Sequence, residues 1–385
     1  MPILEGYRHS FLKILSPKPN PSRFLGCMNS GVSRALASGH MMLCGSTALQ
    51  LRNSDMQIVH FEREPIPENH SIERVFEVVR GALPGDWERK VVHCPTPHHS
   101  VFWLIKGILH AWAEKGEVNH IVGDVHYVAL ALPKSKCILT VHDLNHLYDL
   151  KGLRRILYRL LYFSIPLRRC AVITAISEVT RDLIVKEFPF TSNRIIVIAD
   201  PLPRGYEYRP KSFNSDYPWI LQVGTAPHKN VGRLVQALSG LPCKLHMIGL
   251  LNNETRRSLE SSRIDFENSV NITDAEMVDA YERADLVIFV SLAEGFGMPI
   301  IEAQAVGRPV IVSNLSPMKE VAGEGALAVD PFDIEAIRSA IRTVIEDGQL
   351  RHRMIAAGLE NVKRFNAEVV AGQYAQLYRS IAKCK

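Results

Sequence analysis

The stretch ADLVIFVSLAEGFGMPIIEAQAVGRPVIVSN, residues 284–314, predicts a complete strand–helix–strand unit. Its first part, DLVIFVS, is an uninterrupted apolar run, which is typical of a parallel strand buried on both faces. In the loop EGFGMP that follows, Gly295 and Gly297 permit unusual backbone angles and the close approach of a ligand. Pro299 suits the first helical position, and Gly307 is expected to end the helix. The second apolar run, PVIVSN, then predicts a parallel neighbour of the first strand.

Strands and helices alternate on both sides of this unit. WILQVG and CKLHMIG, before it, predict two more strands of the same sheet. An earlier series occupies the first half of the chain, with candidate strands at 56–64, 90–94, 118–122, 137–141, 171–175 and 194–198. This alternation predicts an α/β fold of two doubly wound, Rossmann-like domains, each a parallel sheet with helices on both faces. Because ligands bind outside the carboxyl ends of such sheets, we expect the site in a cleft where the two domains face each other.

Composition sets the expected domain boundaries. The first 55 residues hold prolines, isolated polar residues and a weak helical pattern, so we expect the regular fold to begin at Met56. The predicted parts are a poorly defined extension at 1–55, a first domain at 56–200, a proline-rich linker at 201–217, a second domain at 218–365 and a helix at 366–385 that packs back onto the first domain.

The bulk composition is that of a soluble globular protein. The chain has 385 residues, of which 46% are hydrophobic and 22% charged, with a net charge of +5. It has neither an apolar run long enough to span a membrane nor an N-terminal secretory pattern, and its seven cysteines form no C-x-x-C pair. These features favour a cytoplasmic protein with reduced thiols. Residues 151–169 carry six basic groups and no acid; a solvated helix face and contact with an anionic membrane both remain open.

Two glutamates enclose the predicted helix start. Amides and the positive dipole end at the start of a helix attract phosphate, whereas Glu294 and Glu302 would repel it. Carboxylates are useful there if each accepts hydrogen bonds from hydroxyl groups on either side of a diphosphate. A sugar nucleotide has such hydroxyls, so Glu294 is expected to meet the hexose and Glu302 the ribose. The alternative is that Glu302 only favours the helix dipole and Glu294 is an ordinary loop acid.

This arrangement resembles the donor half of the family 4 glycosyltransferases, which have the GT-B fold. Residues 284–331 carry the two glutamates separated by seven residues that mark the family, and GTAPHKN, residues 224–230, is similar to its phosphate loop. The stretches ERVFEVVRGALP and VNHIVGDVHYVALALPKSKCILTVHDL resemble the acceptor half of a bacterial polysaccharide subgroup. The likeness covers about residues 56–380. The donor-binding residues that it implies are Gly224, Thr225, Lys229, Gly295, Phe296, Gly297, Met298 and Glu302, and the catalytic residues are His142, Lys229 and Glu294.

One departure from the family pattern concerns the phosphate loop. Many relatives carry an arginine just after the loop glycine, where this chain has Thr225 and Ala226. A second positive charge for the diphosphate is therefore missing or comes from elsewhere. The chain also contains no D-x-D sequence, so no metal and no other cofactor is expected. The helix amides and Lys229 would then neutralise the leaving group.

Histidines in the first domain allow competing interpretations. His142 directly follows the strand CILTV, and the resemblance implies that it reaches the sugar near the reacting carbon. The sequence HDLNH instead suggests a zinc hydrolase, although its first histidine ends a strand and so loses the helical spacing that H-E-x-x-H sites need. In HIVGDVHY, the polar residues either line the acceptor side of the cleft or satisfy local backbone groups; they are His120, Asp124, His126 and Tyr127.

The predicted activity is that of a retaining hexosyltransferase. The partners implied by the resemblance are a nucleoside-diphosphate sugar as donor and a saccharide acceptor, in one version lipid-linked; no nucleic acid is expected. A membrane-linked acceptor would suit attachment of the basic segment to the inner face of the cell membrane. The rival hypotheses are a sugar-nucleotide epimerase of the same architecture and a non-catalytic module that binds nucleotide or membrane.

Overall fold

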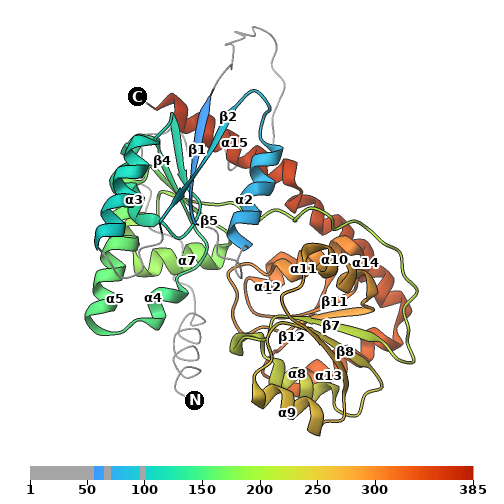
Figure 1. Ribbon diagram of the computed structural model, residues 1–385. Helices are drawn as coiled ribbons and strands as arrows, with labels where there is room; N and C mark the ends of the chain where they lie inside the picture. The colour runs from blue at the N-terminus through green and yellow to red at the C-terminus, as the bar shows by residue number, and fades with distance from the viewer. Residues whose placement is uncertain (1–55, 65–70, 96–100, 385) are drawn as a thin grey trace, which may run out of the picture. The chain divides into compact units, whose positions relative to one another are not determined.

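The computed structural model describes residues 56–64, 71–95 and 101–384 (Figure 1). The extension predicted for residues 1–55 lies outside this part of the chain. Two six-stranded parallel sheets form the framework. The α/β fold class, with two doubly wound sheets, is therefore confirmed.

The first sheet has the strand order β2-β1-β3-β4-β5-β6. Its strands are β1 (Gln57–Arg63), β2 (Glu88–Cys94), β3 (Val118–Ile121), β4 (Cys137–Val141), β5 (Val172–Ala175) and β6 (Ile195–Val197). The helices that connect them are α2 (Ser71–Ala82), α3 (Val101–Ala113), α4 (Asn145–Asp149), α5 (Gly152–Tyr158), a π-helix (Arg159–Ser164), α6 (Ile165–Arg169) and α7 (Glu178–Glu187). Apolar clusters cover both faces of this sheet.

The second sheet has the order β12-β11-β10-β7-β8-β9. Its strands are β7 (Trp219–Val223), β8 (Lys244–Ile248), β9 (Asp265–Ser269), β10 (Leu286–Phe289), β11 (Val310–Ser313) and β12 (Leu327–Val329). Its helices are α8 (Val231–Leu238), α9 (Asn253–Ser261), α10 (Asp274–Arg283), α11 (Met298–Val306), α12 (Met318–Ala322), α13 (Ile334–Glu346) and α14 (Gly348–Asn361). The strand order reverses between β7 and β10, which makes the ends of these two strands the topological switch point where ligands bind.

The last helix, α15 (Ala367–Lys383), packs on the first sheet beside α2 (Figure 1). Tyr374 and Tyr378 belong to the same buried cluster as Phe76 of α2. The Tyr378 hydroxyl lies 3.0 Å from His60 Nε2 and 2.7 Å from His120 Nδ1. This helix therefore supplies polar as well as apolar contacts to a sheet that begins more than 300 residues earlier.

One detail of the expected helices is wrong. Pro299 occupies the second position of α11, because the helix already begins at Met298; either position tolerates a residue without an N–H. Asn230 is the N-cap residue of α8, in a left-handed conformation with φ 62°, and its side chain accepts no hydrogen bond from the helix. Its amide Nδ2 instead donates to the carbonyls of Val290, at 3.1 Å, and Pro331, at 2.7 Å. Gly307 does end α11, with φ 80°.

Candidate active site

The loop after β7 folds back over its own glycine. Gly224 has φ 87°, and a Cβ there would lie 2.8 Å from Cε of Lys229. Only glycine leaves room for the lysine stem at this place and adopts this backbone angle without strain. Thr225, which takes the place of the family arginine, donates from its hydroxyl to the Leu250 carbonyl at 2.7 Å. The loop therefore places one cation, Lys229, above the end of β7.

Hydrogen bonds tie this loop to the loop after β10. Besides the bond from Asn230 Nδ2 to the Val290 carbonyl, the amide of Leu292 donates to the His228 carbonyl at 2.7 Å. The backbone of Asn230 is left-handed, and its side-chain amide reaches both carbonyls. The two loops at the switch point thus form one fixed unit.

Lys229 and Glu294 meet directly within this unit. Lys229 Nζ donates to Glu294 Oε1 at 2.7 Å, and the two side chains are only 16% and 12% exposed. The ammonium group also lies 4.7 Å from the centre of the Phe289 ring. The sequence interpretation assigned these residues to different parts of the donor and did not anticipate the ion pair. Because an ammonium has three donor hydrogens, Lys229 can keep Glu294 and still donate to a phosphate.

The start of α11 offers fewer amides than a regular helix. Pro299 has no N–H, and the Ile300 N–H donates to the Gly297 carbonyl at 3.0 Å. A phosphate here would therefore meet the amides of Met298 and of Gly297, which has φ 112°. The Phe296 side chain is buried and packs edge-on against Phe365, so a donor could contact Phe296 only through its backbone.

Two tyrosines hold Glu302. Tyr281 donates from its hydroxyl to Glu302 Oε2 at 2.7 Å, and Tyr206 makes a second hydrogen bond to the same carboxylate. Partial burial raises the pKa of Glu302 to about 7, although both hydrogen bonds and the charge of Lys229 lower it. Sequence reasoning missed both tyrosines, since Tyr206 lies in the predicted linker and Tyr281 looks like an ordinary core residue of α10.

His142 approaches the loop after β10 from the first sheet. Its Nε2–H donates to the Val122 carbonyl at 3.0 Å. A Cβ on Gly295 would lie 3.1 Å from the His142 carbonyl oxygen. Ser177 Oγ donates to the Gly295 carbonyl at 2.7 Å. Four predicted residues, His142, Lys229, Glu294 and Gly295, are therefore brought together.

Asp200 is a buried carboxyl group that sequence reasoning also missed. It is the last residue of the predicted first domain, 56–200, and no role was expected for it. The side chain is buried, and burial raises its pKa to about 6, while the charge of His142 lowers it. The sequence did contain a signal for this residue, because ligands bind at the carboxyl ends of parallel strands and Asp200 directly follows such a strand.

The polar residues of HIVGDVHY satisfy local groups. His120 is fully buried, with Nε2 2.7 Å from the Thr140 hydroxyl and Nδ1 on Tyr378. Tyr127 donates to the Pro95 carbonyl, and His126 contacts the Tyr162 carbonyl through Nδ1. Asp124 lies 3.5 Å from Arg63 and keeps about half of its side chain exposed. For His120, His126 and Tyr127, the structure therefore favours hydrogen bonding to neighbouring groups of the protein over a place in the acceptor side of the cleft.

The zinc interpretation of HDLNH does not fit the local structure. His142 lies in the loop after β4, whereas His146 lies in α4, so the two do not share one helical face. Within residues 56–64, 71–95 and 101–384, no group of three or more histidine, cysteine, aspartate or glutamate side chains is arranged to hold a metal ion.

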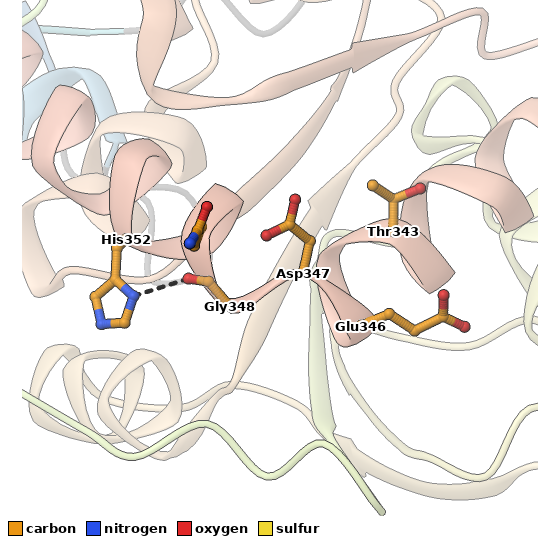
Figure 2. A pocket seen from close by; sticks show the side chains of 6 residues that line it. Thr343, Glu346, Asp347, Gly348 and His352 are labelled. Carbon is orange, nitrogen blue, oxygen red and sulfur yellow. Dashed lines mark hydrogen bonds between the residues drawn. The ribbon is translucent and has the colours of Figure 1, made fainter.

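A surface depression of about 590 Å³ lies elsewhere, between α13 and α14 (Figure 2). Thr343, Glu346, Asp347 and His352 line it. Asp347 accepts a hydrogen bond from the Leu350 amide and caps α14, and His352 bonds to the Gly348 carbonyl (Figure 2). These polar groups serve the helix ends, and none of the predicted site residues takes part.

Residues 207–361, which contain the lysine, both glutamates and the tyrosine of α10, match the family model described as "Glycosyl transferases group 1". This part of the chain is thus similar to the group 1 glycosyltransferases. The chain is 28% identical over 295 residues to the O-antigen chain mannosyltransferase B of Escherichia coli, covering 70% of this chain and 76% of the relative. It is 27% identical to the O-antigen chain mannosyltransferase RfbU of Salmonella typhimurium, over 63% of this chain and 69% of the relative.

Solved structures confirm the GT-B fold of the chain. The crystal structure of Anabaena HepE in complex with UDP and glucose matches with a TM-score of 0.69 at 14% identity, covering 84% of this chain and all of HepE. WaaG, a glycosyltransferase involved in lipopolysaccharide biosynthesis, matches with a TM-score of 0.61 at 14% identity, over 83% of this chain and 99% of WaaG.

Proposed function

We propose that this protein is a glycosyltransferase that moves a hexose from a nucleoside-diphosphate sugar to a hydroxyl group of a saccharide acceptor. The observation that carries the proposal is the joined pair of loops at the switch point. They present Lys229, Glu294 and the start of α11 within one hydrogen-bonded unit, and Glu302 lies one turn further along the same helix. The lysine and the start of the helix attract a negatively charged diphosphate, and the two carboxylates can accept hydrogen bonds from the hydroxyl groups of a sugar.

In this mechanism the protein stabilises the charge that develops as the diphosphate departs. Lys229 and the amides of Gly297 and Met298 bind the leaving diphosphate, and Glu302 accepts hydrogen bonds from the ribose. Glu294 holds Lys229 in place and accepts a hydrogen bond from the hexose. His142 lies near Gly295 and faces the sugar from the other sheet. The family resemblance suggests retention at the anomeric carbon, with the acceptor hydroxyl attacking from the face that the phosphate leaves.

The names of the relatives favour mannose as the transferred hexose. Both O-antigen relatives are named mannosyltransferases, and so is the phosphatidyl-myo-inositol mannosyltransferase of Mycobacterium leprae, which is 30% identical over 40% of this chain and 44% of its own length. The test is a thermal-shift screen of guanosine- and uridine-diphosphate hexoses. We expect a nucleoside-diphosphate mannose to stabilise the protein most; no stabilisation by any nucleotide sugar would contradict the proposed donor class.

A transfer assay distinguishes the proposed function from its two rivals. The donor that binds best is incubated with and without a lipid-linked saccharide, and both the sugar nucleotide and the acceptor are analysed. We expect an extended acceptor. Conversion of the donor to an epimer without any acceptor would identify an epimerase, and binding without any conversion would identify a non-catalytic module.

The proposed chemistry needs no metal ion, because Lys229 and the helix start supply the positive potential. The measurement is turnover after dialysis against a chelator, compared with turnover after adding back Mg²⁺ or Mn²⁺. We expect less than about a twofold difference, since Lys229 and the amides at the start of α11 stabilise the leaving group without a metal ion. A strict dependence on added metal would show that the protein groups do not suffice.

A lipid-linked acceptor would place the protein at the inner face of the cell membrane. No helix in the described part of the chain is long and apolar enough to cross a membrane. The segment 151–169, with six basic residues and no acid, is the first candidate for electrostatic contact with anionic lipid. Release of the protein from membranes by salt would support this contact, and a distribution that is insensitive to salt would count against it.

A further inference from the structure

The joining segment, residues 198–218 between β6 and β7, sends one aromatic ring toward the candidate donor site. From Arg204 to Arg209, Tyr206 has the only side chain that is not exposed. Its ring packs on the apolar cluster of the second sheet, with its centre 5.6 Å from the Tyr281 ring in an edge-on arrangement. A half-buried tyrosine usually has a hydrogen-bond partner for its hydroxyl, and here the partner is the Glu302 carboxylate.

The chain that follows Tyr206 lies against α11. The ring of Tyr208 covers Gly307 at the end of this helix, where a Cβ would lie 2.6 Å from ring atoms. The amide of Arg209 donates to the Val306 carbonyl at 3.2 Å. Helices α10 and α11 lie side by side over the second sheet (Figure 1). The joining segment is therefore attached to the helix whose start is the candidate phosphate site.

The Glu302 carboxylate has room for two hydrogen bonds more than the protein gives it. An ionised carboxylate only accepts, through about four lone-pair sites. The Tyr281 hydroxyl takes one of them at 2.7 Å, and Tyr206 takes another. Burial and the charge of Glu302 raise the pKa of Tyr206, so its hydroxyl keeps its proton and donates. The sites that remain match the two adjacent hydroxyl groups of a ribose.

The ionisation of Glu302 depends on these hydrogen bonds. Burial raises its pKa to about 7, although both tyrosine hydroxyls and the charge of Lys229 lower it. Asp274, at the start of α10, raises it further and is itself paired with Arg74 of α2 at 2.5 Å. Because the pKa lies near neutrality, the loss of one hydrogen bond would change the ionised fraction at physiological pH.

We propose that Tyr206 is a positioning residue for the donor: its hydroxyl fixes the Glu302 carboxylate for the ribose and makes nucleotide affinity depend on the joining segment. The inference rests on the proposed function, in which Glu302 accepts hydrogen bonds from the ribose. Because coupling between two parts of a protein is reciprocal, a bound nucleotide stabilises the joining segment in return.

The first test compares Tyr206→Phe, which removes only the hydroxyl, with the matched control Tyr208→Phe at a 50% exposed ring of the same segment. Titration calorimetry measures the binding of guanosine and uridine diphosphate and of their 2′,3′-dideoxy analogues, which lack the ribose hydroxyls. For the diphosphate that binds the wild type, we expect a dissociation constant about tenfold higher in Tyr206→Phe at pH 7 and unchanged in the control. Its dideoxy analogue should bind the wild type and Tyr206→Phe within about twofold of each other. Equal losses for both probes would overturn the proposal.

The pH dependence of binding separates this role from a general structural one. Without the Tyr206 hydroxyl, the pKa of Glu302 rises further, so the increase in affinity that accompanies its ionisation moves to higher pH. We expect this shift to be up to about one pH unit. In the Glu302→Gln background, adding Tyr206→Phe should change the dissociation constant by less than about twofold. A loss of affinity that is the same at every pH would contradict the positioning role.

Hydrogen exchange tests the coupling to the joining segment. We expect the Arg209 amide to exchange more slowly when the diphosphate is bound to the wild type, and this protection to be lost in Tyr206→Phe. Unchanged exchange in the wild type would overturn the coupling without any variant. Equal protection in both proteins would show that the hydroxyl is not the link.

The outcomes distinguish this inference from the proposed function. Unchanged thermal unfolding shows that Tyr206→Phe is folded. A wild type that binds neither diphosphate contradicts the proposed donor class and, with it, the role of Tyr206. Equal binding by the wild type and Tyr206→Phe contradicts the role of Tyr206 alone. The expected effects on binding without any sugar transfer would contradict the transfer reaction alone.

Discussion

At the scale of single residues, the ion pair of Lys229 and Glu294 is the feature that the sequence pattern does not reveal. The chain has one lysine where many relatives have an additional arginine, and that lysine is held at 2.7 Å by a glutamate of the donor motif. An ammonium group that is already held in place requires less reorganisation free energy when a diphosphate binds than a mobile one does. The pair therefore makes the single cation more effective.

The substitution Glu294→Gln tests this role. We expect turnover to fall by about 10²-fold or more, because both the partner of Lys229 and the acceptor for a hexose hydroxyl are weakened. The unfolding temperature should stay close to that of the wild type. The control is Glu254→Gln, an exposed acid in the first turn of α9. Near-normal turnover of the Glu294 variant would remove the residue from the mechanism.

Glu302 gives the site a pH dependence. Its pKa is raised to about 7, and the groups that face it are Tyr281, Tyr206, Lys229 and Asp274. Only the deprotonated carboxylate accepts hydrogen bonds through both oxygens, so nucleoside-diphosphate affinity should rise as the pH goes from 6 to 8. Titration calorimetry of the wild type and of Glu302→Gln separates this effect from titration of the phosphate itself. Equal pH dependence in both proteins would contradict it.

The same raised pKa has a consequence for stability. A carboxyl whose pKa increases on folding binds its proton more tightly in the folded chain. The contribution of Glu302 to the free energy of unfolding is therefore fully present below about pH 4.5, the ordinary value, and is lost as the pH rises through about 7.

At the scale of elements, the loop after β7 depends on a glycine. Gly224→Ala would strain a backbone with φ 87° and push Cβ against the Lys229 stem. We expect the free energy of unfolding to fall by about 1–3 kcal/mol and donor binding to weaken, because Lys229 is displaced. The matched control is Gly232→Ala in α8, where a Cβ has open space and helix propensity favours alanine. Denaturant unfolding and nucleotide titration measure both effects.

Helix α15 is held to the first sheet by a buried polar contact as well as by apolar packing. Tyr378→Phe would leave His60 and His120 without the hydroxyl that both of them contact. We expect a loss of about 1–3 kcal/mol in the free energy of unfolding, the cost of unpaired buried polar groups. Tyr208→Phe, at an exposed tyrosine, is the control. Equal stability of both variants would show that the contact contributes nothing.

The sequence predicts all of the strands except the two at the edges of the second sheet. The six predicted strands of the first sheet, including its edge strands β2 and β6, and the four central strands of the second are confirmed by the structure. The edge strand β9 has the sequence DFENS, and β12 has three residues, LAV, so neither shows the pattern of a buried strand. Periodicity detects burial on both faces, which an edge strand does not need.

Within the site, sequence reasoning finds residues whose position follows from a motif and misses residues that tertiary contacts supply. Lys229, Glu294 and Glu302 follow from loops and helix starts. Tyr206 and Asp200 come from a stretch that composition marks only as irregular, and their partners lie far away in the sequence. A local sequence pattern does not reveal such contacts, because they form only when segments that are distant in the sequence come together in the folded protein.

At the scale of the whole molecule, loops from both sheets supply the site. Ser177, after β5, bonds to the Gly295 carbonyl, and His142, after β4, lies against the same glycine. A donor bound at the start of α11 would therefore lie close to residues that follow the strands of the first sheet. The place where that donor binds is therefore the property to measure.

The most direct measurement is a crystal structure of the protein with a nucleoside-diphosphate hexose that it binds but does not turn over. The account predicts a β-phosphate oxygen about 3 Å from Lys229 Nζ and near the Met298 amide, the ribose hydroxyls on Glu302 and the hexose beside Glu294. A nucleotide bound elsewhere, with the Lys229–Glu294 pair intact and neither glutamate in contact with a sugar, would contradict it.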